Sequence, residues 1–446
     1  MREAQKRLLA RAARAVLKLQ ARCTREACMP ASSRRLAQLT LSLLLFVTAL
    51  AIGSLAVAAD KPPVRAITAF IDLDPARYEE QFADTANRLR QASAVFQKAG
   101  YEVQTVRITT QPYPRYVRGM SKEQALTLLS NLAALGRKQS VAINIGPAVM
   151  TDEPDPAMLE VLEALQSELK QLDASMIVAS ESGVHWHTVR AAARHIYRVA
   201  QKSPRSQGTF NFAATAMLAP GAPFYPGSYH VQEGGRFSIG LQSPSVVARA
   251  FAAANGDASE ASRLLRAALA TEATQVNALA EQVAQVTGWR YWGFDSTPAP
   301  LKEDSIGAAM ELLHSSSVGS AGTMTAAYIV TKAQADLPGP RVGYNGLMLP
   351  VLEDSLLARR WSEGMLSIDS LLAYSSVCGT GLDTVPLPGD VTEETLARII
   401  GDMAVLAVKW NKPLTARLQP VYGKKAGEMS AFDNPFLVNA KLQPVR

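Results

Sequence analysis

The sequence predicts an α/β fold built on a mainly parallel sheet. Two observations support this prediction: strand-like segments are followed by amphipathic helical segments through most of residues 64–421, and no internal repeat interrupts the alternation. Strands that alternate with helices favour parallel pairing, because each helix carries the chain back to the start of the next strand. Such a sheet is either open or closed into a barrel.

Four strand–helix units are expected in the first half of the chain. The first has a strand at 64–72 and a helix at 76–100, in which Leu89, Ala92 and Phe96 recur at helical spacing. The other predicted units, each a strand followed by a helix, are 101–109 with 122–138, 141–145 with 155–172, and 175–180 with 188–202.

The middle of the chain has a less regular pattern. Strands are expected at 210–217 and 237–241, and residues 219–230 between them are rich in proline, glycine and aromatic residues. Such a segment is either a wall of a binding site or a packed surface loop. The elements expected further on are one or two helices in 259–286, a strand at 291–295, a helix capped by Asp304 and Ser305, helices at 368–374 and 393–410, and a strand at 415–421.

Residues 375–390 are predicted to be a loop between two helices, and they contain Cys378 and Asp383. Glycines permit a close backbone approach, and prolines stiffen the chain. We therefore expect a rigid finger that carries a thiol and a carboxylate. Gly379 and Gly381 are expected where a side chain would collide with a neighbouring wall or with a ligand.

An apolar segment near the amino terminus predicts export. Residues 36–59 contain no charged side chain, follow Arg34 and Arg35, and end in small residues. This order is typical of a secretory signal peptide. We expect residues 1–59 to be a signal peptide with an over-long amino-terminal region, a true start at Met29, and a periplasmic or secreted product. The alternative is a protein anchored in the membrane by residues 36–59, since this run is long enough to span a bilayer.

Loss of this leader changes the charge of the protein. The whole chain has a net charge of +7, but residues 1–58 hold ten basic and two acidic side chains, so the remainder has a net charge of −1. This balance argues against a nucleic-acid partner. Cys378 becomes the one remaining cysteine, so residues 60–446 are expected to form a single domain without an internal disulfide.

Three segments carry a resemblance to a known family: residues 210–230, 343–354 and 374–390. Together they resemble the domain of unknown function family 711, which is related to uncharacterised protein family 0210, over nearly all of the mature chain. The resemblance implies a closed barrel of about ten strands, similar to pyruvate formate-lyase and other glycyl radical enzymes, with the Cys378 loop as a finger inside. It also leaves a homodimer open.

Radical chemistry is not expected to accompany this fold. Residues 341–344 are similar to the loop that carries the radical, but they lack its serine and precede Cys378 instead of following it. An exported protein would also be separated from an activating enzyme.

Several polar residues near predicted strand ends are candidates for ligand binding. Ser182 and Gly183 lie where a strand ends and a helix begins, and the free N–H groups of a helix start bind anions. The segments that resemble the family add Asn211 and Asn345 as candidates.

Acidic residues that follow predicted strands form a second group of candidates. In parallel α/β folds ligands bind at the carboxyl ends of the strands, where carboxylates hold a divalent cation or act as general acid and base. Helix capping is the alternative role for most of them. The group consists of Asp295, Asp304, Glu353 and Asp354, with Ser305 beside them.

Two functional classes follow from these residues. The first is an exported enzyme of unknown reaction that acts on a small polar molecule in the barrel cavity, with Cys378 as nucleophile or acid/base and Asp383 orienting it. His230 is then a candidate base, because a thiol needs a neighbour that lowers its pKa. The second class is a non-catalytic protein that binds a small molecule in the same cavity.

Overall fold

Ten strands form one sheet in the computed structural model, which describes residues 61–231 and 234–445. The order across the sheet is β8-β7-β1-β2-β3-β4-β6-β10-β9, and β5 pairs with β4 beside this path. The strands are β1 (Val64–Ile71), β2 (Val106–Thr110), β3 (Ala142–Val149), β4 (Leu172–Ser180), β5 (Gly183–Val184), β6 (Phe212–Ala216), β7 (Arg236–Leu241), β8 (Arg290–Asp295), β9 (Gly381–Pro388) and β10 (Leu414–Val421).

The sheet is mostly parallel, with two changes of direction. Strands β1, β2, β3, β4 and β6 are parallel neighbours. The parallel pair β7–β8 is antiparallel to β1, and the parallel pair β9–β10 is antiparallel to β6. The prediction of a mainly parallel α/β sheet is confirmed. Because of the two reversals, the amino ends of β1, β2, β3, β4 and β6 share one edge with the carboxyl ends of β7 to β10.

The two outermost strands, β8 and β9, are connected through an irregular segment at 340–351. Arg341 forms an isolated bridge with Phe294 of β8, and Pro350 forms one with Asp383 of β9. The N–H of Phe294 donates to the carbonyl of Pro340, and the N–H of Val351 donates to that of Asp383. This segment therefore runs from one edge of the sheet to the other.

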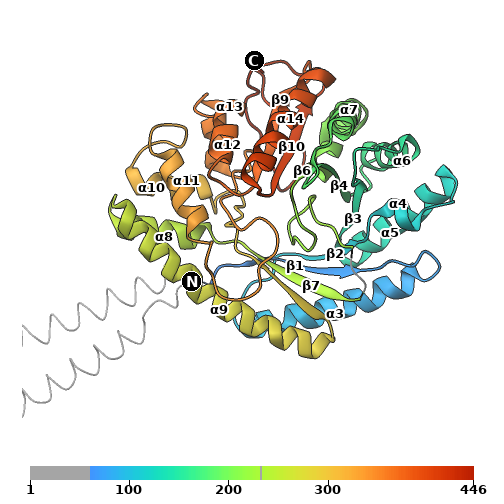
Figure 1. Cartoon of the computed structure of the whole chain (residues 1–446), viewed down its shortest axis with the longest axis horizontal. Coiled ribbons are helices and arrows are strands. Elements are labelled where there is room, and N and C mark those ends of the chain that lie inside the picture. The colour runs from blue at the N-terminus through green and yellow to red at the C-terminus, as the bar shows by residue number, and fades with distance from the viewer. Residues whose placement is uncertain (1–60, 232–233, 446) are drawn as a thin grey trace, which may run out of the picture. The chain divides into compact units, whose positions relative to one another are not determined.

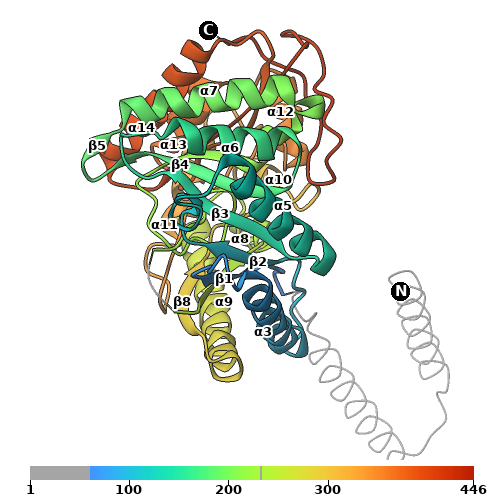
Figure 2. The ribbon, with the colours of Figure 1, turned by 90° about the vertical axis from the view of Figure 1, so that its right-hand side faces the viewer.

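Helices form an outer layer around the strands, and irregular segments occupy the centre (Figure 1; Figure 2). Many helices start at a local cap: Ser121, for example, forms a capping box with Gln124 at the start of α5. The helices are α3 (Tyr78–Lys98), α4 (Tyr113–Tyr116), α5 (Lys122–Gln139), α6 (Pro156–Ser167), α7 (Trp186–Lys202), the 3-10 helix η1 (Pro204–Asn211), α8 (Pro244–Ala254), α9 (Ala258–Thr287), α10 (Ile306–His314), α11 (Thr323–Lys332), α12 (Ser355–Ser362), α13 (Ile368–Ser375) and α14 (Glu393–Trp410).

The sheet is buried on both faces by two separate apolar cores. The larger core packs the strands against the helices. The smaller one is built only from irregular segments, and its members are Leu218, Ala222, Phe224, Ala299, Tyr344 and Met348. Burial on both faces explains why most strands read as continuous apolar runs.

The proline-rich segment 218–230 lies against the inner face of the strands. The side chain of Thr68 in β1 donates to the carbonyl of Pro223 (3.1 Å), and that of Asn144 in β3 donates to the carbonyl of Pro226 (2.7 Å). Strand side chains thus satisfy the carbonyl groups of a segment that has no sheet partner of its own. This segment extends into the central region of the fold in Figure 1.

Several parts of the chain differ from the elements expected, among them a strand and a helix. Residues 381–388 were expected in a loop, but they form strand β9. This strand has one neighbour, β10, and an edge strand tolerates Pro386 and Pro388 because their missing N–H groups leave no ladder bond unmade. Helix α8 was not expected, although Pro244 at its first turn suits a helix start.

The predicted leader, residues 1–59, lies outside the described residues, as does the alternative anchor at 36–59. Among the helices that the structure describes, none is both long and apolar enough to cross a membrane.

Candidate functional site

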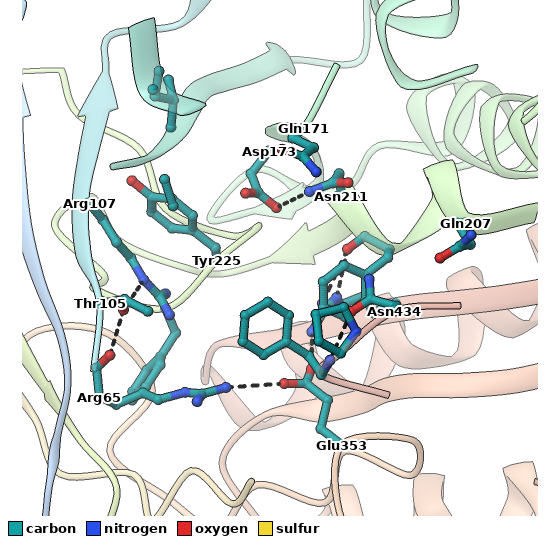
Figure 3. Close-up of a pocket in the computed structure, with 18 of the residues that line it drawn as sticks. Arg65, Thr105, Arg107, Gln171, Asp173, Gln207, Asn211, Tyr225, Glu353 and Asn434 are labelled. Carbon is teal, nitrogen blue, oxygen red and sulfur yellow. Dashed lines mark hydrogen bonds and ion pairs between the residues drawn. The ribbon is translucent and has the colours of Figure 1, made fainter. Parts of the chain in front are cut away.

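A cavity of about 510 Å³ opens at the edge where the five parallel strands begin (Figure 3). Arg65, Arg107 and Asp173 line it, and each is the second residue of its strand, β1, β2 and β4. Asn211, directly before β6, has a similar position. The pairing register aligns Asp173 with Asn144 and Thr109, and Arg107 lies two residues before Thr109, so Arg107 and Asp173 lie on the same face of the sheet. Arg65 does not share this register, since the partner of Arg107 is Thr68, but it lines the same cavity.

Two arginines form one wall of this cavity. The guanidinium of Arg107 donates to Thr105 Oγ1 (3.0 Å) and to the carbonyl of Pro223 (3.1 Å), and it lies 4.8 Å from the centre of the Tyr225 ring. Burial and, to a smaller extent, the charge of Arg65 lower the pKa of Arg107 to about 10. Burial also lowers the pKa of Arg65, although Glu353 opposes this effect. Both cations are therefore desolvated and repel each other.

A third arginine organises the carboxylates on the opposite side. Arg417 Nη1 lies 2.7 Å from Glu353 Oε1 and 3.1 Å from Asp383 Oδ1. Its Nε and Nη2 both donate to the carbonyl of Phe210, whose ring it covers at 4.3 Å. Glu353 also reaches Arg65, with 3.5 Å between Oε2 and Nη2. Arg417 has its donors engaged within the protein, so we assign it a positioning role.

Two carboxyl groups in this cavity have raised pKa values. Burial raises the pKa of Asp173 to about 7, against the effects of the Asn211 hydrogen bond and of Arg417 and Arg107. Burial likewise raises the pKa of Asp383 to about 6, against the charge of Arg417. Groups that exchange a proton near neutral pH suit general acid–base catalysis.

Asp173→Asn is expected to remove part of the pH dependence of stability. The folded pKa of about 7 lies above the ordinary value of 3.8, so the folded protein holds a proton that the unfolded chain releases. The free energy of unfolding of the wild type therefore falls as pH rises from about 4 to about 7 because of this group. The variant lacks this loss, so its stability relative to wild type should increase from pH 5 to pH 8 in urea unfolding.

The matched control for this experiment is Asp402→Asn on the exposed side of α14. Its stability curve should stay parallel to that of wild type over the same pH range. A parallel curve for Asp173→Asn as well would contradict the raised pKa.

Three of the residues predicted from the sequence line the cavity: Asn211, Glu353 and Asp383. Asn211 Nδ2 donates to Asp173 Oδ1 at 3.2 Å. Glu353 and Asp383 meet at Arg417. The structure thus brings together residues from the three segments that carried the family resemblance.

Cys378 and His230 do not line this cavity. Cys378 is 1% exposed in the turn before β9, where its N–H donates to the carbonyl of Tyr374 and its own carbonyl accepts from Lys412 Nζ. His230 is fully buried, with Nε2 3.2 Å from Asp72 Oδ1, and burial lowers its pKa. The structure therefore gives His230 an acidic neighbour of its own.

The two glycines of the predicted finger are required by backbone packing. A Cβ on Gly379 would lie 2.4 Å from the Cα of Gly346. Gly381 has φ +88°, and a Cβ there would lie 2.5 Å from the carbonyl oxygen of Thr415. Neighbouring backbone therefore explains both positions.

Other predicted candidates hold the fold together. The buried carboxylate of Asp295 accepts from the N–H groups of Thr297, Tyr344 and Asn345. Asn345 Nδ2 donates to the carbonyl of Val342 within the same turn. These contacts fix the turn that leads into the bridging segment 340–351.

The remaining acidic candidates lie near helix starts, and one of them is a cap. Asp354 caps α12 through the N–H groups of Leu356 and Leu357, and it accepts from Ser305, which caps α10. Asp304 was expected to cap α10 together with Ser305, but its carboxylate accepts from Gln242 at 2.7 Å instead. Within the described residues no three His, Cys, Asp or Glu side chains are grouped to hold a metal ion.

Ser182 lies in the short turn between β4 and β5, and Gly183 is the first residue of β5. Ser182 Oγ is 2.8 Å from Ser180 Oγ and 3.3 Å from His185 Nε2. The hydroxyl is therefore engaged within its own turn, and neither residue lines the cavity.

Four residues that shape the cavity were not singled out from the sequence. The sequence did contain a signal for them, because each of the four is the one charged residue of its strand. Arg65, for example, is the one charged residue of Val64–Ile71. A buried charge at such a position is costly unless it has a partner or a function. The four residues are Arg65, Arg107, Asp173 and Arg417.

Comparisons with known proteins agree on one family. A family model described as "Uncharacterised ACR (DUF711)" matches residues 56–433. A UPF0210 protein of Pyrobaculum islandicum is 29% identical over 396 residues, which cover 82% of this chain and 86% of that protein. A UPF0210 protein of Pyrobaculum arsenaticum is 30% identical over 362 residues, 77% of this chain and 79% of the relative. A UPF0210 protein of Bifidobacterium animalis is 30% identical over 304 residues, 64% of this chain and 66% of the relative.

Proposed function

Since this chain belongs to the DUF711 family of uncharacterised proteins, we propose a function from its own cavity: it binds a small anionic molecule between Arg65 and Arg107 and acts on it as an acid–base enzyme. The observation that carries the proposal is the pair of desolvated guanidinium groups on one wall. Among the described residues, the hydrogen-bond partners of Arg107 are neutral oxygens, so its charge lacks a carboxylate in direct contact. An anion between the two arginines would offset their repulsion.

The acid–base part of the proposal is supported by Asp173 and Asp383. Their raised pKa values place a proton donor and a proton acceptor beside the bound anion at neutral pH. The alternative is a binding protein that uses the same cavity without a reaction. Neutral amides at both positions would abolish turnover in an enzyme, while a binding protein would keep its affinity for a simple anion without hydroxyl groups.

The proposed barrel is closed in the manner of pyruvate formate-lyase. The support for it is the segment 340–351, which bridges to both β8 and β9, and the separate apolar core on the inner face. In this arrangement residues 375–380, with Cys378, are the finger, and the cavity is one mouth of the barrel. Export to the periplasm or the exterior is proposed from the leader pattern alone. A nucleophilic role for Cys378 stays a prediction, and the chemistry of the cavity does not depend on it.

Arg107→Gln tests the anion site directly. We expect wild type to show a saturable rise in melting temperature with at least one probe from inorganic phosphate, sulfate, oxalate, malonate and citrate, at constant ionic strength. A ligand at a hundred times its Kd adds about 2.7 kcal/mol of stability. The variant should lose this shift. Without a probe it should melt at or above the wild-type temperature, because a repelling buried charge is removed and Thr68 still donates to Pro223.

The control for this experiment is Arg194→Gln, which removes a surface charge paired with Glu393. It should keep the anion-induced shift unchanged. An Arg107→Gln variant that melts earlier than wild type and keeps the shift would mean that Arg107 serves the fold and not a ligand.

A further inference from the structure

We infer that the anionic ligand is a polyhydroxylated acid, of the class of sugar acids and sugar phosphates, whose hydroxyl groups face Asp173. This inference rests on the anion site proposed above and adds the chemistry of the rest of the ligand. The acidic group would lie between Arg65 and Arg107, and the hydroxylated part would extend across the cavity to the opposite wall (Figure 3).

That wall is rich in neutral amides. Each amide offers both a donor and an acceptor, which is the pattern that complements a hydroxyl group, since a hydroxyl also donates and accepts. An ammonium group is a poorer match, because it has three donors and no acceptor. The amide side chains are those of Gln171, Gln207, Asn211 and Asn434.

Asp173 places the most specific requirement on the chemistry of the ligand. Its Oδ1 accepts from Asn211 Nδ2 at 3.2 Å, and within the described part of the chain its Oδ2 has no hydrogen-bond donor, although the residue is only 9% exposed. This oxygen belongs to the lining of the cavity, so it is available to accept a hydrogen bond from a ligand. A second anionic group on the ligand would be repelled here, whereas a hydroxyl group would donate to this oxygen.

Apolar surfaces complete the fit. Phe224, Tyr225 and Met348 also line the cavity, and flat apolar side chains suit the C–H faces of a sugar. A cavity of about 510 Å³ is in the range of ordinary small-molecule sites, which is about 300–1,000 Å³. The cavity therefore accommodates a molecule considerably larger than phosphate or acetate.

The test uses matched probes in isothermal titration calorimetry with the whole folded protein. Gluconate and hexanoate share a carboxylate and a six-carbon chain but differ in hydroxyl groups, 6-aminohexanoate carries an ammonium group, and glucose 6-phosphate carries a phosphate. We expect gluconate or glucose 6-phosphate to bind about tenfold or more tightly than hexanoate, which corresponds to one hydrogen bond to a charged group. The comparison of gluconate with glucose 6-phosphate then shows whether the acidic group of the ligand is a carboxylate or a phosphate.

Asp173→Asn is the decisive variant. It should reduce the preference for the hydroxylated probe to within about threefold, since the hydrogen bond to a charged acceptor is lost, while hexanoate binds as well as before or better. Near pH 7, binding of the hydroxylated probe to wild type should release protons. The reason is that a hydroxyl group that donates to the ionised carboxylate lowers the pKa of Asp173. Titrations in two buffers of different ionisation enthalpy measure this release.

Three results would overturn the inference while leaving the anion site intact: binding of hexanoate as tight as that of both gluconate and glucose 6-phosphate, tighter binding of 6-aminohexanoate, or proton uptake with the hydroxylated probe. If no probe binds, and none of the simple anions shifts the melting temperature, the anion site itself is wrong.

Discussion

Arg417→Met is expected to lower the free energy of unfolding by about 3–5 kcal/mol, the usual result of removing one partner from a buried ion pair. The side chains of Arg417, Glu353 and Asp383 are only 7%, 11% and 9% exposed. Methionine fills similar space and can still pack on the Phe210 ring, but it leaves two carboxylates without their shared cation. The two acids must then repel each other or take up protons.

Urea unfolding at pH 5 and pH 8 measures this effect. Protonation relieves the repulsion, so the loss should be larger at pH 8 than at pH 5. Adding Glu353→Gln to Arg417→Met should recover part of the stability. The surface variant Arg194→Gln, whose side chain is 60% exposed, should change stability by about 1 kcal/mol or less. A similarly small and pH-independent loss of stability for Arg417→Met would contradict this prediction. It would show that water solvates the two carboxylates.

Local signals in the sequence were sufficient for most helices and several strands. Helix α14 coincides with the predicted residues 393–410, because its amphipathic pattern begins after the cap Thr392 and ends at Asn411. Strand β9 was missed because two prolines in an otherwise apolar run normally argue against a strand. Their tolerance depends on β9 having a single neighbour, which is a property of the whole sheet and not of the segment.

The direction of the strands could not be predicted for a similar reason. Strand β7 pairs with β1 in antiparallel fashion although the partners Ile67 and Ile239 are 172 residues apart, and no local pattern encodes that partner. The rule that ligands bind at carboxyl ends holds for sheets of one direction. Here the two reversals bring amino and carboxyl ends to one edge, and the cavity at that edge contains Asp173 from the start of β4 and Glu353 from the turn before α12.

The candidate site could not be predicted from local sequence patterns either. Arg65, Arg107 and Arg417 are far apart in the sequence, and their meeting depends on the strand order β1-β2-β3-β4-β6-β10. Position after a strand did identify acidic residues, but it did not separate a carboxylate bound to backbone N–H groups, such as Asp295, from one that faces a cavity, such as Glu353. That distinction comes only from the neighbours that folding supplies.

Gly379→Ala is expected to destabilise the protein by about 3 kcal/mol, at the upper end of ordinary overpacking. The added methyl group would lie 2.4 Å from the Cα of Gly346 and 2.9 Å from its carbonyl carbon. Both obstacles are backbone, so no change of rotamer relieves the contact. The turn is also held in place, because the N–H of Gly379 donates to the carbonyl of Leu347 at 3.0 Å.

The matched control is Gly401→Ala in helix α14, where the added methyl group meets only the ring of Trp186 at 3.1 Å. That ring is 49% exposed and can move, and alanine favours a helix over glycine by about 1 kcal/mol, so this variant should be neutral or more stable than wild type. Thermal and urea unfolding of the two variants compare the same change of one methyl group against fixed backbone and against a movable side chain. If Gly379→Ala unfolds at the same urea concentration as Gly401→Ala, residues 346 and 379 are not packed backbone to backbone, and the segment 340–351 is not held against the start of β9.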